Sequence, residues 1–95
     1  MKLCDLVTIR TNFPDAHFWL VRRGSEDRIG EPTRVFNKEH IGLKVERTDI
    51  LLPDYLFYVF VSIHNTGHWK RLATGTLSLV NIRVSDVRNI ELSPR

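Results

Sequence analysis

The hydrophobic positions of this chain form several short runs and one long run. The short runs are rich in β-branched and aromatic residues, and turn-forming clusters separate them, which is the pattern of strands joined by turns. On this basis strands are expected at residues 6–9, 17–22, 33–36, 41–45, 77–82 and 89–92. The segment 17–22 contains a continuous apolar stretch without alternation, so this strand is expected at the centre of the sheet, buried on both faces. Residues 33–36 are expected as a short edge strand that returns as its hairpin partner.

The long run, at residues 53–64, predicts the main helix. Pro53 suits the first helical turn, where its missing N–H has no partner to lose, and Asp54 complements the helix dipole. Five apolar residues recur at helical spacing and predict the face that packs on the core: Leu52, Leu56, Val59, Phe60 and Ile63. The other positions are mostly apolar as well, so we expect neighbours to cover the helix on two sides. Its β-branched residues leave a strand as the alternative.

A shorter helix is expected at residues 68–73, ended by Thr74-Gly75-Thr76. The elements together predict an α+β fold in which a small mixed or antiparallel sheet packs on one main apolar helix, with a short second helix. A chain of 95 residues is within the usual length of a single domain, so residues 1–95 are expected to form one domain.

Composition narrows the functional classes only a little. The chain has 14 Lys and Arg against 11 Asp and Glu, which gives a formal charge of +3 that permits contact with an anion without requiring it. Cys4 is the only cysteine, which excludes an intrachain disulfide and a cysteine-based metal site. No apolar run reaches the length of a membrane span, and Asp5 stands where a secretory signal needs an apolar core. We therefore expect a cytoplasmic protein without membrane contact.

Catalytic motifs are missing from the sequence. His64 and His68 are four residues apart, as zinc ligands on a helix are, but Asn65-Thr66-Gly67 between them interrupts the helix. The chain has no serine nucleophile motif, no clustered carboxylate pair, no P-loop and no dinucleotide fingerprint. We expect no enzymatic activity, no catalytic residue, no metal and no cofactor.

Two basic segments point to a binding function more clearly than any motif points to catalysis. Arg22, Arg23 and Arg28 cluster in a polar loop, where neighbouring acidic residues partly neutralise them. Trp69, Lys70 and Arg71 form the second segment. An exposed Trp69 would offer a stacking surface beside two phosphate-pairing cations, whereas the alternative places Trp69 in the core and leaves both cations solvated.

Four short segments follow one another in the second half of the chain: Asp54-Tyr55-Leu56-Phe57-Tyr58, Arg71-Leu72-Ala73-Thr74-Gly75-Thr76, Asn81-Ile82 and Asp86-Val87-Arg88-Asn89-Ile90-Glu91-Leu92. Their order resembles the C-terminal part of a target recognition domain in type I restriction–modification specificity subunits. In that family a Tyr-Leu-x-Tyr helix and a short helix precede a Gly-Ser or Gly-Thr turn. The earlier Arg22-Arg23-Gly24-Ser25 and Ile29-Gly30 are similar to a loop of the same family.

The resemblance implies sequence-specific binding of double-stranded DNA without catalysis, with a methyltransferase or nuclease subunit, or another protein, as partner. The matching positions that would face DNA, with the cations beside them, are Arg22, Arg23, Ser25, Arg28, Lys70, Arg71, Thr74, Gly75 and Thr76. Complete specificity subunits also carry a second recognition domain and long helical spacers, so this chain would be a reduced stand-alone relative, a fragment, or a mobile-element protein that kept the scaffold and changed its use.

The alternative function is a phage or mobile-element protein-interaction module that binds a host defence complex. That function predicts an exposed aromatic patch around Trp19, Tyr55, Tyr58 or Trp69 rather than a basic surface.

Overall fold

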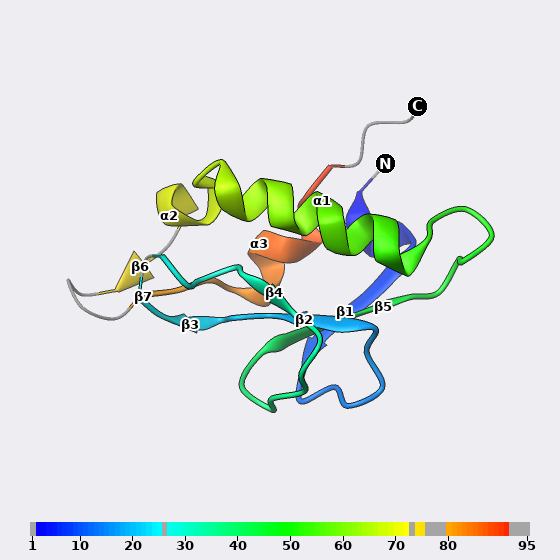
Figure 1. Cartoon of the computed structure of the whole chain (residues 1–95), viewed down its shortest axis with the longest axis horizontal. Helices are drawn as coiled ribbons and strands as arrows, with labels where there is room; N and C mark the ends of the chain where they lie inside the picture. The colour runs from blue at the N-terminus through cyan, green and yellow to red at the C-terminus, as the bar shows by residue number, and fades with distance from the viewer. Residues whose placement is uncertain (1, 26, 73, 76–79, 92–95) are drawn as a thin grey trace.

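The computed structural model describes residues 2–25, 27–72, 74–75 and 80–91. The elements follow in the order η1 (a 3-10 helix, Leu3–Asp5), β1 (Val7–Thr11), β2 (Phe18–Leu20), β3 (Arg23–Gly24), β4 (Pro32–Thr33), β5 (Ile41–Val45), α1 (Pro53–Asn65), α2 (His68–Leu72), β6 (Thr74–Gly75), β7 (Val80–Asn81) and α3 (Val84–Arg88). The predicted α+β class is confirmed, with one main helix and a short second one beside an antiparallel sheet (Figure 1).

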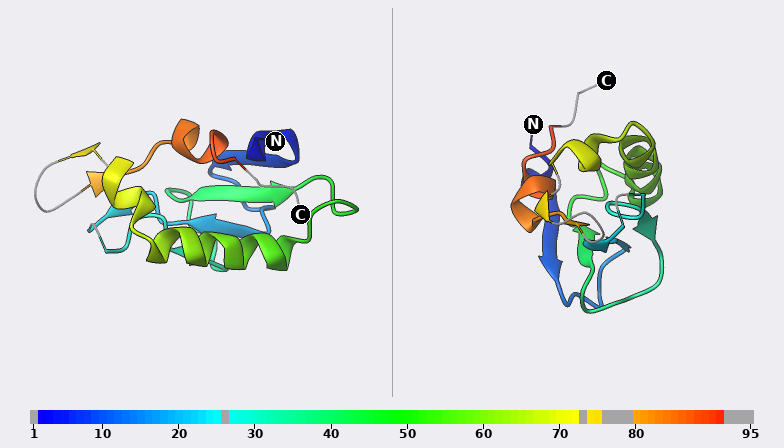
Figure 2. Two further views of the ribbon diagram at one scale, coloured as in Figure 1. Left: turned by 90° about the horizontal axis from the view of Figure 1, so that it is seen from above. Right: turned by 90° about the vertical axis from the view of Figure 1, so that its left-hand side faces the viewer.

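The main sheet has the strand order β1-β5-β2-β4, with every neighbouring pair antiparallel. β2 is an inner strand and all three of its residues are buried, as the unbroken apolar run predicts. β4 is its hairpin partner at the edge, although the strand covers Pro32–Thr33 rather than residues 33–36. The main helix α1 runs along the β4 side of this sheet, while α3 and η1 pack against β1 at the opposite edge (Figure 2).

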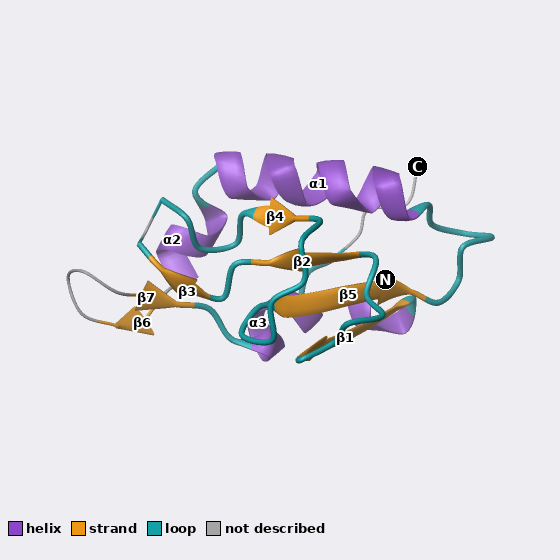
Figure 3. Ribbon diagram, turned by 60° about the horizontal axis from the view of Figure 1, so that its bottom comes forward, coloured by secondary structure: helices purple, strands orange, loops and turns teal. Residues whose placement is uncertain are grey.

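A second, smaller sheet was not predicted. It has the order β3-β7-β6 and lies at one end of the molecule (Figure 3). β3 forms inside the segment expected to be a loop, where Arg23 pairs with Asn81. Of the strand expected at residues 77–82, the structure has β7 at Val80–Asn81; residue 82 is not part of the strand, and residues 77–79 lie outside the described part of the chain. The strand expected at residues 89–92 is wrong for residues 89–91, since Glu91 makes an isolated bridge to Lys2, and residue 92 is not among those described.

The core of the protein lies between the main sheet and α1. Phe18 of β2 meets Phe60 of α1 with ring centroids 5.9 Å apart, and Phe60 stacks on Trp69 of α2 at 6.2 Å. Trp69 is only 1% exposed. The prediction that Trp69 is exposed and offers a stacking surface is therefore wrong. The alternative, which places Trp69 in the core, is confirmed. The reason is that α2 turns back after Gly67, which has a φ of +78°, and brings the indole onto the end of the core.

The main helix is covered on one side only. Leu56 and Phe60 are buried on the predicted core face, and Val59 and Ile63 are partly buried against the same core. The expected second cover is wrong, because Tyr55 is 57% and Tyr58 is 64% exposed. One sheet can cover only one face of a helix, and tyrosine tolerates the outer face because its hydroxyl stays hydrated. The prediction that Leu52 lies on the core face is also wrong, since Leu52 is the helix N-cap and is 64% exposed.

Candidate nucleic-acid interface

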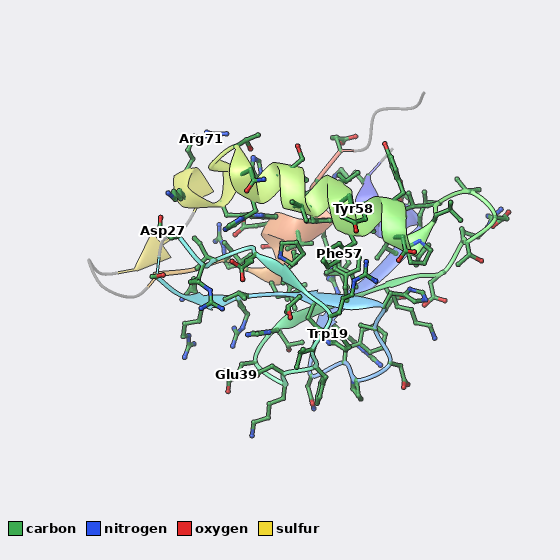
Figure 4. The ribbon with its side chains drawn as sticks, in the orientation of Figure 1. Trp19, Asp27, Glu39, Phe57, Tyr58 and Arg71 are labelled. Atoms are coloured by element: carbon green, nitrogen blue, oxygen red, sulfur yellow. The ribbon has the colours of Figure 1, made fainter. Side chains whose placement is uncertain are left out.

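The two basic segments of the sequence lie together at one end of the molecule. This basic end consists of the described site residues Arg22, Arg23, Ser25, Arg28, Lys70, Arg71, Thr74 and Gly75 and the elements that carry them, β3, α2 and β6 (Figure 1). Thr76, the remaining predicted site residue, lies outside the described residues. Figure 4 shows Asp27 and Arg71 at this end, remote from the loop that joins β5 to α1. The molecule is 41 Å long, so its two ends are several Debye lengths apart at physiological salt.

The small sheet is the first connection between the two segments. β7 pairs with β3 on one side and with β6 on the other. Arg23 and Thr74 therefore both face Asn81 in register, and Gly24 and Gly75 both face Val80. Residues that are some fifty positions apart in the chain thus share one short ribbon of backbone. This pairing could not be predicted from the sequence, because two-residue strands carry no periodicity.

Asp27 is the second connection. Its carboxylate Oδ1 lies 3.0 Å from the Lys70 Nζ of α2. Its backbone carbonyl lies 2.8 Å from the His64 Nε2 near the end of α1. A carbonyl oxygen only accepts, so His64 donates through Nε2 in this contact. One residue of the arginine-bearing loop is therefore held both by α1 and by α2.

Gly30 is the third connection. Its φ is +77°, and a Cβ built on it would lie 1.9 Å from the Trp69 Cδ1. The neighbouring Ile29 is fully buried, and the Gly30 N–H donates to the Val21 carbonyl at 2.7 Å. The base of the loop is thus packed against the same indole that closes the core. The described part of this loop is therefore packed on α2.

Three of the five cations at the basic end have carboxylate partners among the described residues. Arg22 donates from Nε to the Glu39 carbonyl at 2.9 Å and places Nη2 3.5 Å from its Oε2. Arg28 lies 3.6 Å from Glu31, and Lys70 pairs with Asp27 as described. The Arg28 and Lys70 pairs are largely solvent-exposed, and such pairs contribute only about 0–1 kcal/mol, so an incoming anion can displace them.

Arg23 and Arg71 are the two cations that are most available. Both are exposed. Within the described part of the chain, the Arg23 side chain makes no ion pair or hydrogen bond. The guanidinium of Arg71 donates from Nη1 to the Thr66 carbonyl at 3.4 Å and leaves its other donors to solvent. These two arginines come from the two different basic segments, so an anion bound by both would bridge β3 and α2.

His40 adds no positive charge near this end. Burial, followed by the positive charge of Arg28, lowers the pKa of His40, so this ring stays neutral at physiological pH. His64 was considered as a metal ligand, and its Nε2 instead contacts the Asp27 carbonyl. Among the residues described, no three His, Cys, Asp or Glu side chains are grouped so that they would hold a metal ion.

Sequence reasoning missed Glu39 and His64 as members of this end. The partners of both are far away in the chain, since Glu39 pairs with Arg22 and His64 contacts Asp27. No local spacing marks such contacts. Asp27 was expected to help neutralise the arginines of its own loop, whereas the structure pairs it with Lys70 of α2.

A second exposed surface follows the outer side of α1. Tyr55 and Tyr58 are exposed on it, as are Leu52 and the preceding Ile50. Figure 4 shows Tyr58 on this helix and Trp19 below it in the sheet. Trp19 is 6% exposed and its Nε1 donates to the Phe13 carbonyl at 2.9 Å. Of the four aromatic residues expected in a protein-binding patch, the two tyrosines are exposed and the two tryptophans are buried.

Comparison with known proteins identified no relative of this chain. No family model, no curated protein and no solved structure matches this chain. None of the helices in the described ranges is both long and apolar enough to cross a membrane.

Proposed function

We propose that this chain is a non-enzymatic module that binds double-stranded DNA through its basic end in the cytoplasm, in the manner of a reduced restriction–modification target recognition domain. The observation that carries the proposal is that residues from both basic segments are held at one end, through the β3-β7-β6 ribbon and the contacts of Asp27.

The proposed contacts follow from how each cation is held. Arg23 and Arg71 are exposed and have guanidinium donors free for phosphate oxygens or guanine edges. Arg28 and Lys70 are held by weak exposed pairs, so they exchange a carboxylate for a phosphate at small cost. Arg22 is the least available, because its side chain is 29% exposed and bonded to Glu39 twice. We therefore assign Arg22 to support of the loop, with DNA contact made by the other four.

Titration of labelled duplex DNA at two salt concentrations, followed by fluorescence anisotropy, tests the proposal. Binding should weaken steeply with salt, because each phosphate neutralised by a cation contributes about 0.9 to the slope of log K against log salt. Combining Lys70→Ala with Arg71→Ala should weaken binding and lower that slope by about 1–2.

The matched control combines Arg34→Ala with Arg47→Ala. It removes the same amount of charge away from the basic end. Arg34 pairs with Asp54 in the first turn of α1, and Arg47 pairs with Asp49 in the β5–α1 loop. The control should bind DNA much as the unmodified protein does. If no binding occurs at low salt, or if both double variants lose the same affinity, DNA binding by the basic end is wrong.

Protein binding through α1 is the second candidate function, and the exposed Leu52, Tyr55 and Tyr58 favour it. Under this proposal a partner protein, such as a methyltransferase or nuclease subunit or a host defence complex, packs on the outer face of the helix. Replacing Tyr55 and Tyr58 by Ser should abolish capture of that partner in nuclease-treated extract. A partner retained by the serine variant would contradict it.

A further inference from the structure

The contact between Asp27 and Lys70 differs in kind from the other contacts of the basic end. The backbone of Asp27 is fixed, because its carbonyl accepts from His64 Nε2 at 2.8 Å. Its carboxylate remains in solvent, with the side chain 86% exposed, and lies 3.0 Å from Lys70 Nζ. A fixed backbone with an exposed carboxylate is able to hold or release a lysine by side-chain rotation alone.

We propose that the Asp27 carboxylate occupies the place on Lys70 that a DNA phosphate takes, so that it acts as a built-in competitor that limits affinity. The inference rests on the proposed DNA binding. A carboxylate presents two oxygens to an ammonium group much as a phosphate does, and Lys70 is 49% exposed on the side open to solvent. DNA that binds must displace Asp27 from Lys70 and then remain near its negative charge.

Both effects weaken binding by a moderate factor. The exposed pair is weak and the like charge acts through water, so each effect lowers affinity by only about twofold to threefold. Together these predict that Asp27 lowers affinity for duplex DNA by about threefold to tenfold at low salt. The difference should shrink as salt increases, since added ions screen exposed charges.

Asp27→Asn is the sharpest perturbation, because it removes the charge and keeps the shape of the side chain and the backbone contact with His64. Asp49→Asn is its matched control. Asp49 also pairs with an exposed cation, Arg47 Nη2 at 2.9 Å, and its removal changes the net charge equally, but it lies in the loop at the opposite end. The measurement is anisotropy of a labelled duplex with both variants and the unmodified protein.

Asp27→Asn should bind about threefold to tenfold more tightly, while Asp49→Asn should stay within about twofold of the unmodified protein. In the Lys70→Gln background the gain from Asp27→Asn should shrink to the smaller part that comes from charge repulsion alone. A gain of undiminished size there overturns the competition with Lys70. Equal or weaker binding of Asp27→Asn also overturns it, since Asp27 would then position Lys70 for DNA. If the unmodified protein and all variants fail to bind, the proposed function itself is wrong.

Discussion

Replacement of Gly30 by Ala is expected to loosen the junction between the arginine-bearing loop and α2. Gly30 has a φ of +77°, where a residue with a Cβ is strained by about 1–2 kcal/mol. The added Cβ would also lie 1.9 Å from the Trp69 Cδ1, within a fully packed region. Overpacking of a core by one methyl group costs about a further 1–3 kcal/mol. Gly30→Ala should therefore lower the free energy of unfolding by about 2–5 kcal/mol.

Gly67→Ala separates the two causes. Gly67 has nearly the same φ, +78°, but the nearest atom to its Cβ position is the Arg71 Nη1 at 4.0 Å. This variant should lose only the conformational part, about 1–2 kcal/mol. The difference between the two variants then reports the contact between Gly30 and Trp69.

Urea unfolding, followed by far-UV circular dichroism, measures the difference. With a urea m-value of about 1.5 kcal/mol/M, the midpoint should fall by about 1.5–3 M for Gly30→Ala and by about 1 M for Gly67→Ala. Trp69 fluorescence should change in the folded state of Gly30→Ala alone. If both variants lose the same stability and neither changes the fluorescence, Trp69 does not pack on Gly30, and the placement of the loop on α2 is refuted.

Two further predictions concern the helix and the histidine. Phe60→Ala should destabilise the protein by about 3–5 kcal/mol because it empties the centre of the core, whereas Tyr58→Ala on the exposed face should change stability by less than about 0.5 kcal/mol in the same urea assay. Stability should fall as the pH drops below the ordinary histidine value of 6.5, because the lowered pKa of His40 means that the unfolded chain binds the proton first. His40→Gln should reduce this dependence, and an unchanged pH profile would contradict the assignment.

The parts of the fold that could be predicted are those set by local pattern. Residues 17–22 contain a continuous apolar stretch, residues 41–45 alternate apolar with small or polar residues, and the main helix has its own periodicity and a proline in its first turn. These features act over a few residues, so the sequence displays them directly. The exposed outer side of α1 could not be predicted. The apolar residues and tyrosines of a helix do not indicate whether one or two neighbouring elements pack on it.

The candidate site could be predicted as two basic segments, but not their meeting at one end of the molecule. Its assembly depends on contacts between residues distant in sequence: the pairing of β3 with β7, the contacts of Asp27 with His64 and Lys70, and the packing of Gly30 on Trp69. Burial of Trp69 also depends on where α2 turns after Gly67. None of these has a signature in spacing or composition.

The central claim is that the two basic segments form one DNA-binding surface, and single charge substitutions test it most directly. Arg23→Gln in β3 and Arg71→Gln in α2 should each weaken duplex binding, and each should lower the slope of log K against log salt by about 0.9. Arg47→Gln, which removes the same charge at the opposite end, should leave both quantities unchanged. If all three variants behave alike, or if only one of the two basic segments matters, the claim is contradicted.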